Sequence, residues 1–255
     1  MLVLKSIPAL QNHINKLKSH RNIIGFVPTM GALHEGHLSL IENSIKENDF
    51  TIVSIFVNPT QFNDSDDLNS YPSDINSDVK ILKLISGKII IFNPDSQQIY
   101  SGDVKSDYFD LEGLDKFMEG KCRGNHFQGV ATVVNKLFSM VNPNNVYFGE
   151  KDFQQLRIIE NLVNQRKLKI RVIRCKTFRA KDGLALSSRN NKLNFSSKKI
   201  ATNLFKALNF AKENFDTLDI VKIEEKVIEL LAEFPQITLD YFSIADEQNL
   251  QPTRI

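Results

Sequence analysis

The sequence predicts an α/β fold whose parallel sheet is covered by helices on both faces. Strand-like and helix-like segments alternate through residues 1–176 of the 255. The strand-like segments are nearly continuous apolar or β-branched runs, such as TIVSIFV at residues 51–57. Such runs are typical of strands buried on both faces, and the alternation is typical of parallel sheets. We therefore predict a Rossmann-like, doubly wound parallel sheet over residues 1–176 and a small C-terminal α+β lid domain over residues 177–255.

Each element of the first domain is predicted from a local pattern. In the helices, apolar side chains recur every three to four positions, as Leu38, Ile41 and Ile45 do. One helix is followed by Ser86 and Gly87, which is a typical glycine stop. The predicted strands are 23–27, 51–57, 88–92, 145–148 and 169–175. The predicted helices are 4–20, 38–45, 74–85, 127–141 and 149–164.

The remaining segments are predicted as loops or as parts of the second domain. Residues 63–74 are polar and rich in turn formers, and residues 100–125 show only weak periodicity. The stretch GLDKFMEGKC superficially resembles a phosphate loop, but its glycines are too far apart and a cysteine replaces Ser or Thr. In the second domain we predict two helices, at 197–214 and 219–234, and a strand at 238–244.

The composition excludes several classes of protein. A net charge of +2 is too small to indicate nucleic-acid binding, and no run approaches the ~20 apolar residues of a membrane span. Cys122 and Cys175 are far apart and fit no metal-ligand spacing, which is typical of reduced thiols in a cytoplasm. We therefore expect a cytoplasmic protein that binds neither nucleic acid nor membrane.

Two histidines mark the most informative stretch, PTMGALHEGH at residues 28–37. His34 and His37 stand where a predicted strand passes through a glycine turn into a helix. A helix N-terminus attracts anions through its free N–H groups and the helix dipole, and two imidazoles add further donors. Metal binding is an alternative, but the spacing is not the HExxH of zinc proteases and no third ligand is evident nearby. We therefore predict a phosphate site that binds a nucleoside triphosphate.

Three polar segments follow directly on predicted strands, at residues 28–37, 58–61 and 149–155. In a doubly wound parallel sheet, ligands bind beyond the carboxyl ends of the strands. We therefore expect these three segments to meet in one site.

Six segments carry a family resemblance and cover most of the first 190 residues. They are PTMGALHEGH (28–37), SIFVNPTQF (54–62), YPSD (71–74), GVATVVNKLF (129–138), VYFGEKDFQQL (146–156) and DGLALSSRN (182–190). In this order they resemble the pantoate–β-alanine ligases (pantothenate synthetases), a family of the HxGH nucleotidylyltransferase superfamily. The resemblance implies a cytoplasmic homodimer that condenses (R)-pantoate with β-alanine to pantothenate. The reaction would pass through a pantoyl adenylate and release AMP and pyrophosphate from ATP.

The resemblance also implies a role for individual residues. ATP would be bound by Met30, Gly31, Ala32, Leu33, His34, Glu35, Gly36, His37, Gly149, Glu150, Lys151, Asp152, Phe178, Leu186, Ser187, Ser188 and Arg189. Gln61 and Gln155 would hold pantoate, and Asp78 would contact the magnesium ion on the phosphates. The catalytic residues would be His34, His37, Lys151, Ser187, Ser188 and Arg189.

The chemistry of this reaction suits these residue types. A carboxylate that attacks the α-phosphate of ATP is already ionised near neutral pH and needs no general base. The step needs donors that stabilise the negative charge building up on the phosphoryl groups. The position of Lys151 also indicates a functional role, because the helix dipole disfavours a cation at a helix start and a structural lysine would be unusual there.

Several alternatives stay open at this stage. The chain could be another HxGH nucleotidylyltransferase that acts on a phosphate acceptor, or an RNA-binding module or inactive regulator that keeps the fold. Two glutamines in place of Arg or Lys argue against a phosphate acceptor. Taken alone, Asp152 could be a helix cap, Asp78 a solvated helix charge and Gln61 a turn residue.

Overall fold

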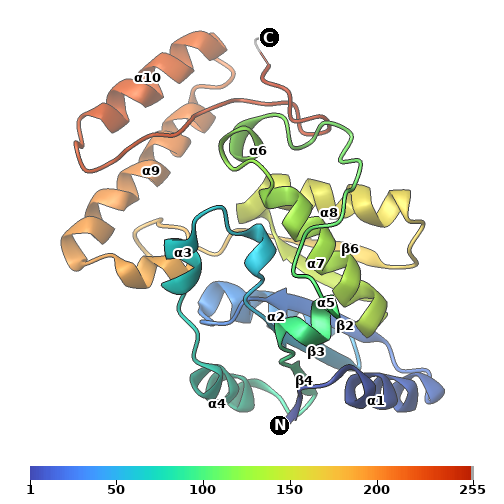
Figure 1. The fold of residues 1–255 in the computed structure, drawn as a ribbon. Helices are drawn as coiled ribbons and strands as arrows, with labels where there is room; N and C mark the ends of the chain where they lie inside the picture. Colours follow the sequence, from blue (N-terminus) through green and yellow to red (C-terminus); the bar gives the residue numbers. More distant parts are fainter. Residues whose placement is uncertain (254–255) are drawn as a thin grey trace.

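The computed structural model describes residues 1–253, and a six-stranded sheet forms its centre (Figure 1). The strands are β1 (Leu2–Leu4), β2 (Ile24–Thr29), β3 (Phe50–Ile55), β4 (Ile89–Phe92), β5 (Asn145–Gly149) and β6 (Arg171–Cys175). Their spatial order is β1-β4-β3-β2-β5-β6, and every pair is parallel. The chain winds from β2 outward to β3 and β4, then returns to place β5 on the other side of β2. The predicted doubly wound parallel sheet is confirmed, with its switch point between β2 and β5.

Alternate residues of each strand build two separate cores, one on each face of the sheet. Phe26 pairs with Ile52 and both face the first core, whereas Val27 pairs with Val53 and both face the second. The first core is covered by α1 (Ile7–Ser19), α7 (His126–Val141) and α8 (Phe153–Gln165). The second is covered by α2 (Glu35–Glu47) and α4 (Ile75–Ile85). Burial on both faces explains why the inner strands β2, β3 and β4 are mostly apolar.

Short elements account for most differences from the prediction. The edge strand β1 has three residues, too few for a periodic pattern, and it pairs with β4. Helices α3 (Ser65–Asn69), α5 (Ser96–Tyr100) and α6 (Met118–Cys122) lie in segments whose composition indicates loops. Two of them begin at aspartates that accept hydrogen bonds from the first turn, Asp64 and Asp95. Because such capping residues also favour turns, the sequence did not distinguish a short helix from a loop in these segments.

The C-terminal part contains two long helices, α9 (Phe195–Glu213) and α10 (Ile220–Ala232), packed on each other around a third core. The strand predicted at 238–244 is wrong: within residues 1–253 the segment pairs with no strand, and the nearest β-bridge joins Ala245 to Pro252. Its apolar residues Leu239, Phe242 and Ile244 instead pack on the third core.

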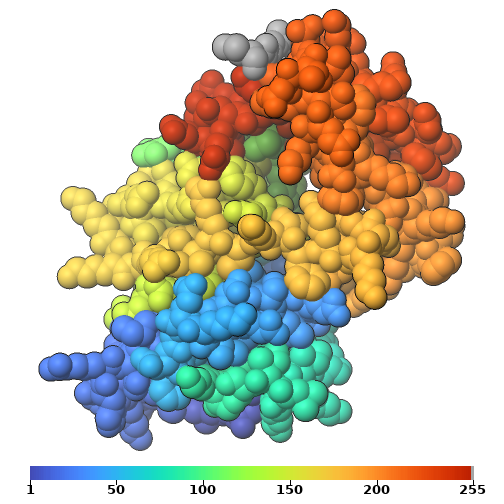
Figure 2. All heavy atoms as spheres, turned by 180° about the vertical axis from the view of Figure 1, so that it is seen from behind, coloured from blue at the N-terminus to red at the C-terminus, as the bar shows by residue number. Residues whose placement is uncertain are grey.

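The chain then returns from the C-terminal helices to the first part (Figures 1 and 2). Leu250 is 1% exposed and belongs to the first core, and Glu247 pairs with Arg174 of β6 at 2.6 Å. The second part is therefore anchored to the sheet by its end as well as by its beginning. Among the described residues, none of the helices has the length and apolarity needed to span a membrane.

Candidate active site

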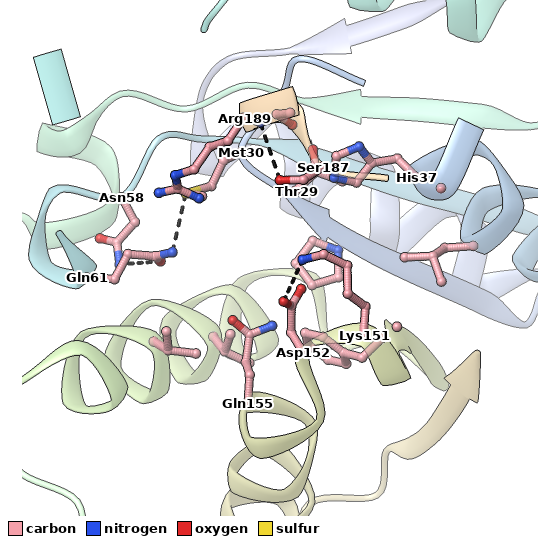
Figure 3. A pocket seen from close by; sticks show the side chains of 18 of the residues that line it. Thr29, Met30, His37, Asn58, Gln61, Lys151, Asp152, Gln155, Ser187 and Arg189 are labelled. Atoms are coloured by element: carbon pink, nitrogen blue, oxygen red, sulfur yellow. Dashed lines mark hydrogen bonds and ion pairs between the residues drawn. The ribbon is translucent and has the colours of Figure 1, made fainter. Parts of the chain in front are cut away.

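A pocket opens at the carboxyl ends of β2 and β5, which is the switch point of the sheet (Figure 3). Its walls come from the segments after β2, β3 and β5, as the strand ends predict, together with residues 176–189. The apolar side is formed by α7 through Val130, Val133, Val134 and Leu137. A doubly wound sheet places its ligand site at this position.

His34 and His37 begin α2 at the edge of the pocket, and their rings lie 4.1 Å apart. Nδ1 of His34 accepts the Gly36 N–H at 3.1 Å, and Nδ1 of His37 accepts the His34 N–H at 3.4 Å. Each imidazole therefore caps the helix with one nitrogen. When the rings are neutral, the proton must sit on Nε2, so both residues carry an N–H donor on their other side.

The surroundings keep both histidines neutral. Burial is the main cause, and the nearby Lys151 ammonium adds to it; together they hold the pKa of His34 below its usual range. Burial lowers the pKa of His37 to about 3, with smaller contributions from His34 and Lys151. The substrate-free site is thus a set of hydrogen-bond donors, with Lys151 as a cation beside them.

The His37 ring is expected to stay neutral, with its proton on Nε2, as the pH falls from 8 to about 5. Because the folded-state pKa is depressed, the unfolded chain takes up this proton first, near pH 6.5. His37 therefore reduces stability increasingly as the pH falls from 6.5 toward 3, and has no such effect above 6.5. Nitrogen-15 NMR of the imidazoles would test this, with His37→Gln assigning the signal. A His37 ring that titrates near pH 6.5 would contradict the prediction.

Asp78 fixes the turn that leads into α2, from a position in the first turn of α4. Its two carboxylate oxygens accept the N–H groups of Ala32 at 3.1 Å and Leu33 at 2.8 Å. Gly31 and Ala32 have φ angles of +83° and +50°, a left-handed path that needs such support. Asp78 is 2% exposed and does not line the pocket. Both carboxylate oxygens of Asp78 are therefore used to hold this turn.

Asp78→Asn is expected to lower the free energy of unfolding by about 1–3 kcal/mol, because one backbone N–H then faces an amide N–H₂ instead of an acceptor. Thermal or denaturant unfolding would measure the change, and Glu42→Gln, an exposed position on α2, is the control. The magnesium concentration that gives half-maximal activity should not change. A large increase in that concentration without a loss of stability would show that Asp78 contacts the metal.

Gln61 stands on a short 3-10 turn, Pro59–Gln61, at the end of β3. Its Oε1 accepts from Nδ2 of Asn58 at 3.0 Å, and its Nε2 points to Sδ of Met30 at 3.3 Å (Figure 3). The backbone carbonyl of Gln61 accepts from Nδ1 of the buried His126 at 2.6 Å. Because sulfur is a weak acceptor, Nε2 is available to donate to a substrate.

Asn58 is in turn fixed from two directions. Its Nδ2 also donates to the carbonyl of Gly129 at 3.2 Å, and its Oδ1 accepts from the hydroxyls of Thr60 and Tyr100. Asn58 is 1% exposed. Asn58 belongs to the polar segment 58–61 that was predicted for the site, but its role in holding the Gln61 amide is visible only in the structure.

Lys151 and Asp152 follow β5 on a 3-10 turn, and their side chains pair at 2.8 Å (Figure 3). Gln155, one turn into α8, also lines the pocket. Its neighbour Gln154 is buried and bonds to the carbonyls of Leu114 and Phe117, so it holds the loop before α6. Of two adjacent glutamines, the structure brings only Gln155 to the pocket.

The segment 186–189 closes the pocket on the side opposite Gln155. Ser188 is buried, and its Oγ donates to the carbonyl of Ala32 at 3.1 Å. The Ser187 hydroxyl accepts from the Arg189 N–H at 3.3 Å, which starts the 3-10 turn Ser188–Lys192. The segment thus lies directly against residues 30–37, the turn and helix start that carry His34 and His37 and that we call the histidine turn.

Most of the residues predicted for the site line this one pocket. They are Met30, His34, Gly36, His37, Gln61, Gly149, Lys151, Asp152, Gln155, Phe178, Leu186, Ser187, Ser188 and Arg189. The structure does not bring Gly31, Ala32, Leu33, Glu35, Asp78 or Glu150 to its surface. The backbone of the first three supports the histidine turn. Tyr71, Glu119, Arg123 and His126 also line the pocket, and sequence reasoning assigned no role to them.

The fold and the site together define an α/β protein with a doubly wound parallel sheet, whose pocket at the switch point is lined by paired histidines and a lysine. The family model for pantoate-beta-alanine ligase matches residues 2–255. The chain belongs to this family.

Known relatives agree over nearly the whole chain. A pantothenate synthetase of Flavobacterium psychrophilum is 44% identical over 250 residues, which covers 98% of this chain and 89% of the relative. One from Christiangramia forsetii is 42% identical over 251 residues, with the same coverage. Among solved structures, the crystal structure of pantothenate synthetase from Thermus thermophilus has a TM-score of 0.92 at 36% identity, covering 100% of this chain and 90% of that one.

Another solved relative contains ligands. The crystal structure of pantoate-beta-alanine ligase from Francisella tularensis, described as complexed with beta-gamma ATP and beta-alanine, has a TM-score of 0.80 at 40% identity. The match covers 90% of this chain and 86% of that one.

Proposed function

We infer that this chain is an ATP-dependent ligase that joins pantoate to β-alanine to form pantothenate. The family match over residues 2–255 and relatives at about 44% identity support this function. The observation in the structure that carries it is one pocket in which His34, His37 and Lys151 face Gln61 and Gln155. Cationic and N–H donors suit the phosphates, and the amides suit the hydroxyls and carboxylate of pantoate.

We propose that the reaction has two steps. In the first, a carboxylate oxygen of pantoate forms a bond to the α-phosphorus of ATP, and the bond to the pyrophosphate breaks. In the second, the neutral amine of β-alanine attacks the carbonyl carbon of the adenylate, and AMP leaves with the electrons of the broken C–O bond. The ammonium of β-alanine gives one proton to water to become the attacking amine, and the nitrogen gives a second proton to water as the amide forms. Nε2–H of His37 and the Lys151 ammonium stabilise the charge on the leaving phosphates.

Magnesium is proposed to enter on the phosphates of ATP. Mg²⁺ usually keeps several waters and is held by substrate phosphates with few protein ligands. In the described part of the chain, no group of three or more His, Cys, Asp or Glu side chains is placed to hold a metal ion. The magnesium dependence of activity in Asp78→Asn tests whether this carboxylate also contacts the metal.

Residues 177–255 are proposed to act as a lid, as the family resemblance implies. The contact of Ser188 with Ala32 and the position of Leu186 in the pocket wall support this role. A closed site protects a mixed anhydride from water. A cytoplasmic homodimer is likewise proposed from the family resemblance, and light scattering of the purified protein tests the dimer.

The decisive experiment measures AMP formation with ATP, pantoate and β-alanine, leaving out one at a time. Pantoate and ATP without β-alanine should still exchange labelled pyrophosphate into ATP. ADP as product, with no exchange, would show an acyl-phosphate mechanism. Pyrophosphate release that is independent of β-alanine, with the adenylyl group transferred to a phosphate acceptor and no free AMP, would show another nucleotidylyltransferase.

A further inference from the structure

Arg189 is held in the pocket wall by Asp67, a residue of α3 that lies 122 positions earlier in the chain. Nη2 of Arg189 lies 2.6 Å from Oδ2 of Asp67, and Nε lies 3.2 Å from Oδ1. The two parallel hydrogen bonds form a bidentate pair, the strongest and most directional contact between these residue types. The pair joins the loop after β3 to the turn that follows Ser187.

Neighbouring contacts hold the same two segments together. Lys192 lies 3.6 Å from Asp67 and donates to the Ser70 hydroxyl at 2.8 Å. The Arg189 guanidinium lies 5.4 Å from the centre of the Tyr71 ring. Asp67 is thus the centre of a small cluster with Ser70, Tyr71, Arg189 and Lys192. The hydrogen bond from Arg189 is the main reason that the pKa of Asp67 lies below its usual value.

The remaining edge of the guanidinium is not used within the described residues. A guanidinium carries five N–H donors, and Asp67 takes one on Nε and one on Nη2. The donors of Nη1 and the second donor of Nη2 have no acceptor among residues 1–253. Since Arg189 lines the pocket and Asp67 does not, this second edge is the one left for a ligand.

We propose that Asp67 is a positioning residue for Arg189: it holds the Nε–Nη2 edge so that the Nη1–Nη2 edge receives an anionic oxygen of the substrate in the pocket. This inference rests on the proposed role of Arg189 at the phosphates. A free arginine loses rotamer entropy when it is fixed, which opposes its binding to a ligand. Asp67 removes much of that cost in advance, so the donor is already in place when negative charge develops.

Competition between Asp67 and the phosphates for Arg189 would have a different effect on ATP binding. If Asp67 instead competed with the phosphates for Arg189, its removal would free the guanidinium and ATP would bind more tightly. The geometry favours positioning, because a bidentate contact on one edge leaves the other edge of the fork open.

The test compares Asp67→Asn, Arg189→Ala and the double variant in full-length protein, by steady-state kinetics and pyrophosphate exchange. Asp66→Asn is the matched control, since Asp66 is exposed in the same helix and its side chain makes no contact to Arg189. Asp67→Asn should lower kcat/KM for ATP about ten- to a hundredfold, mainly through kcat, and Asp66→Asn should have no effect. Asp67→Glu, which keeps the charge, should recover part of the loss.

The double variant decides whether Asp67 acts through Arg189. If it does, adding Asp67→Asn to Arg189→Ala causes no further loss. If the fold-losses of activity in Asp67→Asn and Arg189→Ala multiply in the double variant, the two residues act independently. That result would overturn the inference and leave the role of Arg189 intact. Tighter ATP binding in Asp67→Asn, or full activity in that variant, would also overturn it. Full activity in Arg189→Ala would refute the role of Arg189 itself and the inference with it.

Discussion

His37→Ala and Lys151→Ala are each expected to lower the rate of adenylate formation by about two to three orders of magnitude. Both residues line the pocket, and in the proposed mechanism each contact strengthens as negative charge accumulates and the α-phosphorus–oxygen bond breaks. His37 presents its Nε2–H because Nδ1 is occupied by a backbone N–H, and Lys151 presents an ammonium beside it. The loss should therefore appear in the rate constant and much less in the apparent affinity for ATP.

Pyrophosphate exchange at saturating ATP and pantoate measures this step alone. Lys169→Ala is the control for Lys151, because Lys169 is an exposed lysine outside the pocket. Circular dichroism and thermal unfolding would establish that both variants keep the fold. A near-normal rate with only weaker ATP binding would make the residue a binding group instead of a stabiliser of the transition state.

The histidine turn could be predicted from the sequence because its chemistry is local. A strand, a glycine turn and a helix start lie within residues 24–37, and the helix N-terminus itself creates the anion site. The parallel sheet could be predicted for a similar reason, since burial on both faces leaves an apolar run in each strand. Residues 28–37, 58–61 and 149–155 then had to meet, because parallel strands end at one edge.

The roles of Asp78 and Asp67 could not be predicted in the same way. Asp78 occupies the first turn of a helix, where an aspartate commonly interacts with the helix dipole, but its carboxylate bonds to a turn 45 residues away. Asp67 lies in a polar stretch typical of a loop, and its partner comes 122 residues later. Partner choice at such distances depends on how the elements pack, which a local pattern does not contain.

The C-terminal segment shows the reverse case, in which a correct local pattern gave a wrong element. Residues 238–244 are TLDYFSI, and four of the seven are β-branched or aromatic, as is typical of strands. The structure packs Leu239, Phe242 and Ile244 on α9 and α10, and among the described residues no strand lies beside the segment. Such a composition predicts side chains that suit a half-buried surface, but a strand also needs a hydrogen-bonding partner.

Gly129→Ala is expected to reduce activity with pantoate about a hundredfold, although it places a better helix former inside α7. A Cβ at this position would lie 2.3 Å from the carbonyl oxygen of Thr60 and 2.8 Å from Cα of Gln61. Both are backbone atoms, so the 3-10 turn that carries Gln61 must move by roughly an ångström to restore a normal contact. The carbonyl of Gly129 also accepts from Asn58, which orients the Gln61 amide.

The gain and the cost in this variant can be compared. Alanine in place of glycine favours the helix by about 1 kcal/mol, whereas overpacking against rigid neighbours costs about 1–3 kcal/mol. The clash should therefore outweigh the propensity, and the fold should lose a little stability while the position of Gln61 changes. The loss should appear as weaker use of pantoate, with ATP binding close to normal, because the histidine turn and Lys151 lie elsewhere in the pocket. Gly87→Ala is the control, since no atom lies within 4 Å of a Cβ there. Unchanged kinetics with pantoate in Gly129→Ala would mean that the position of Gln61 does not affect pantoate binding. That result would contradict the proposed contact between Gln61 and pantoate.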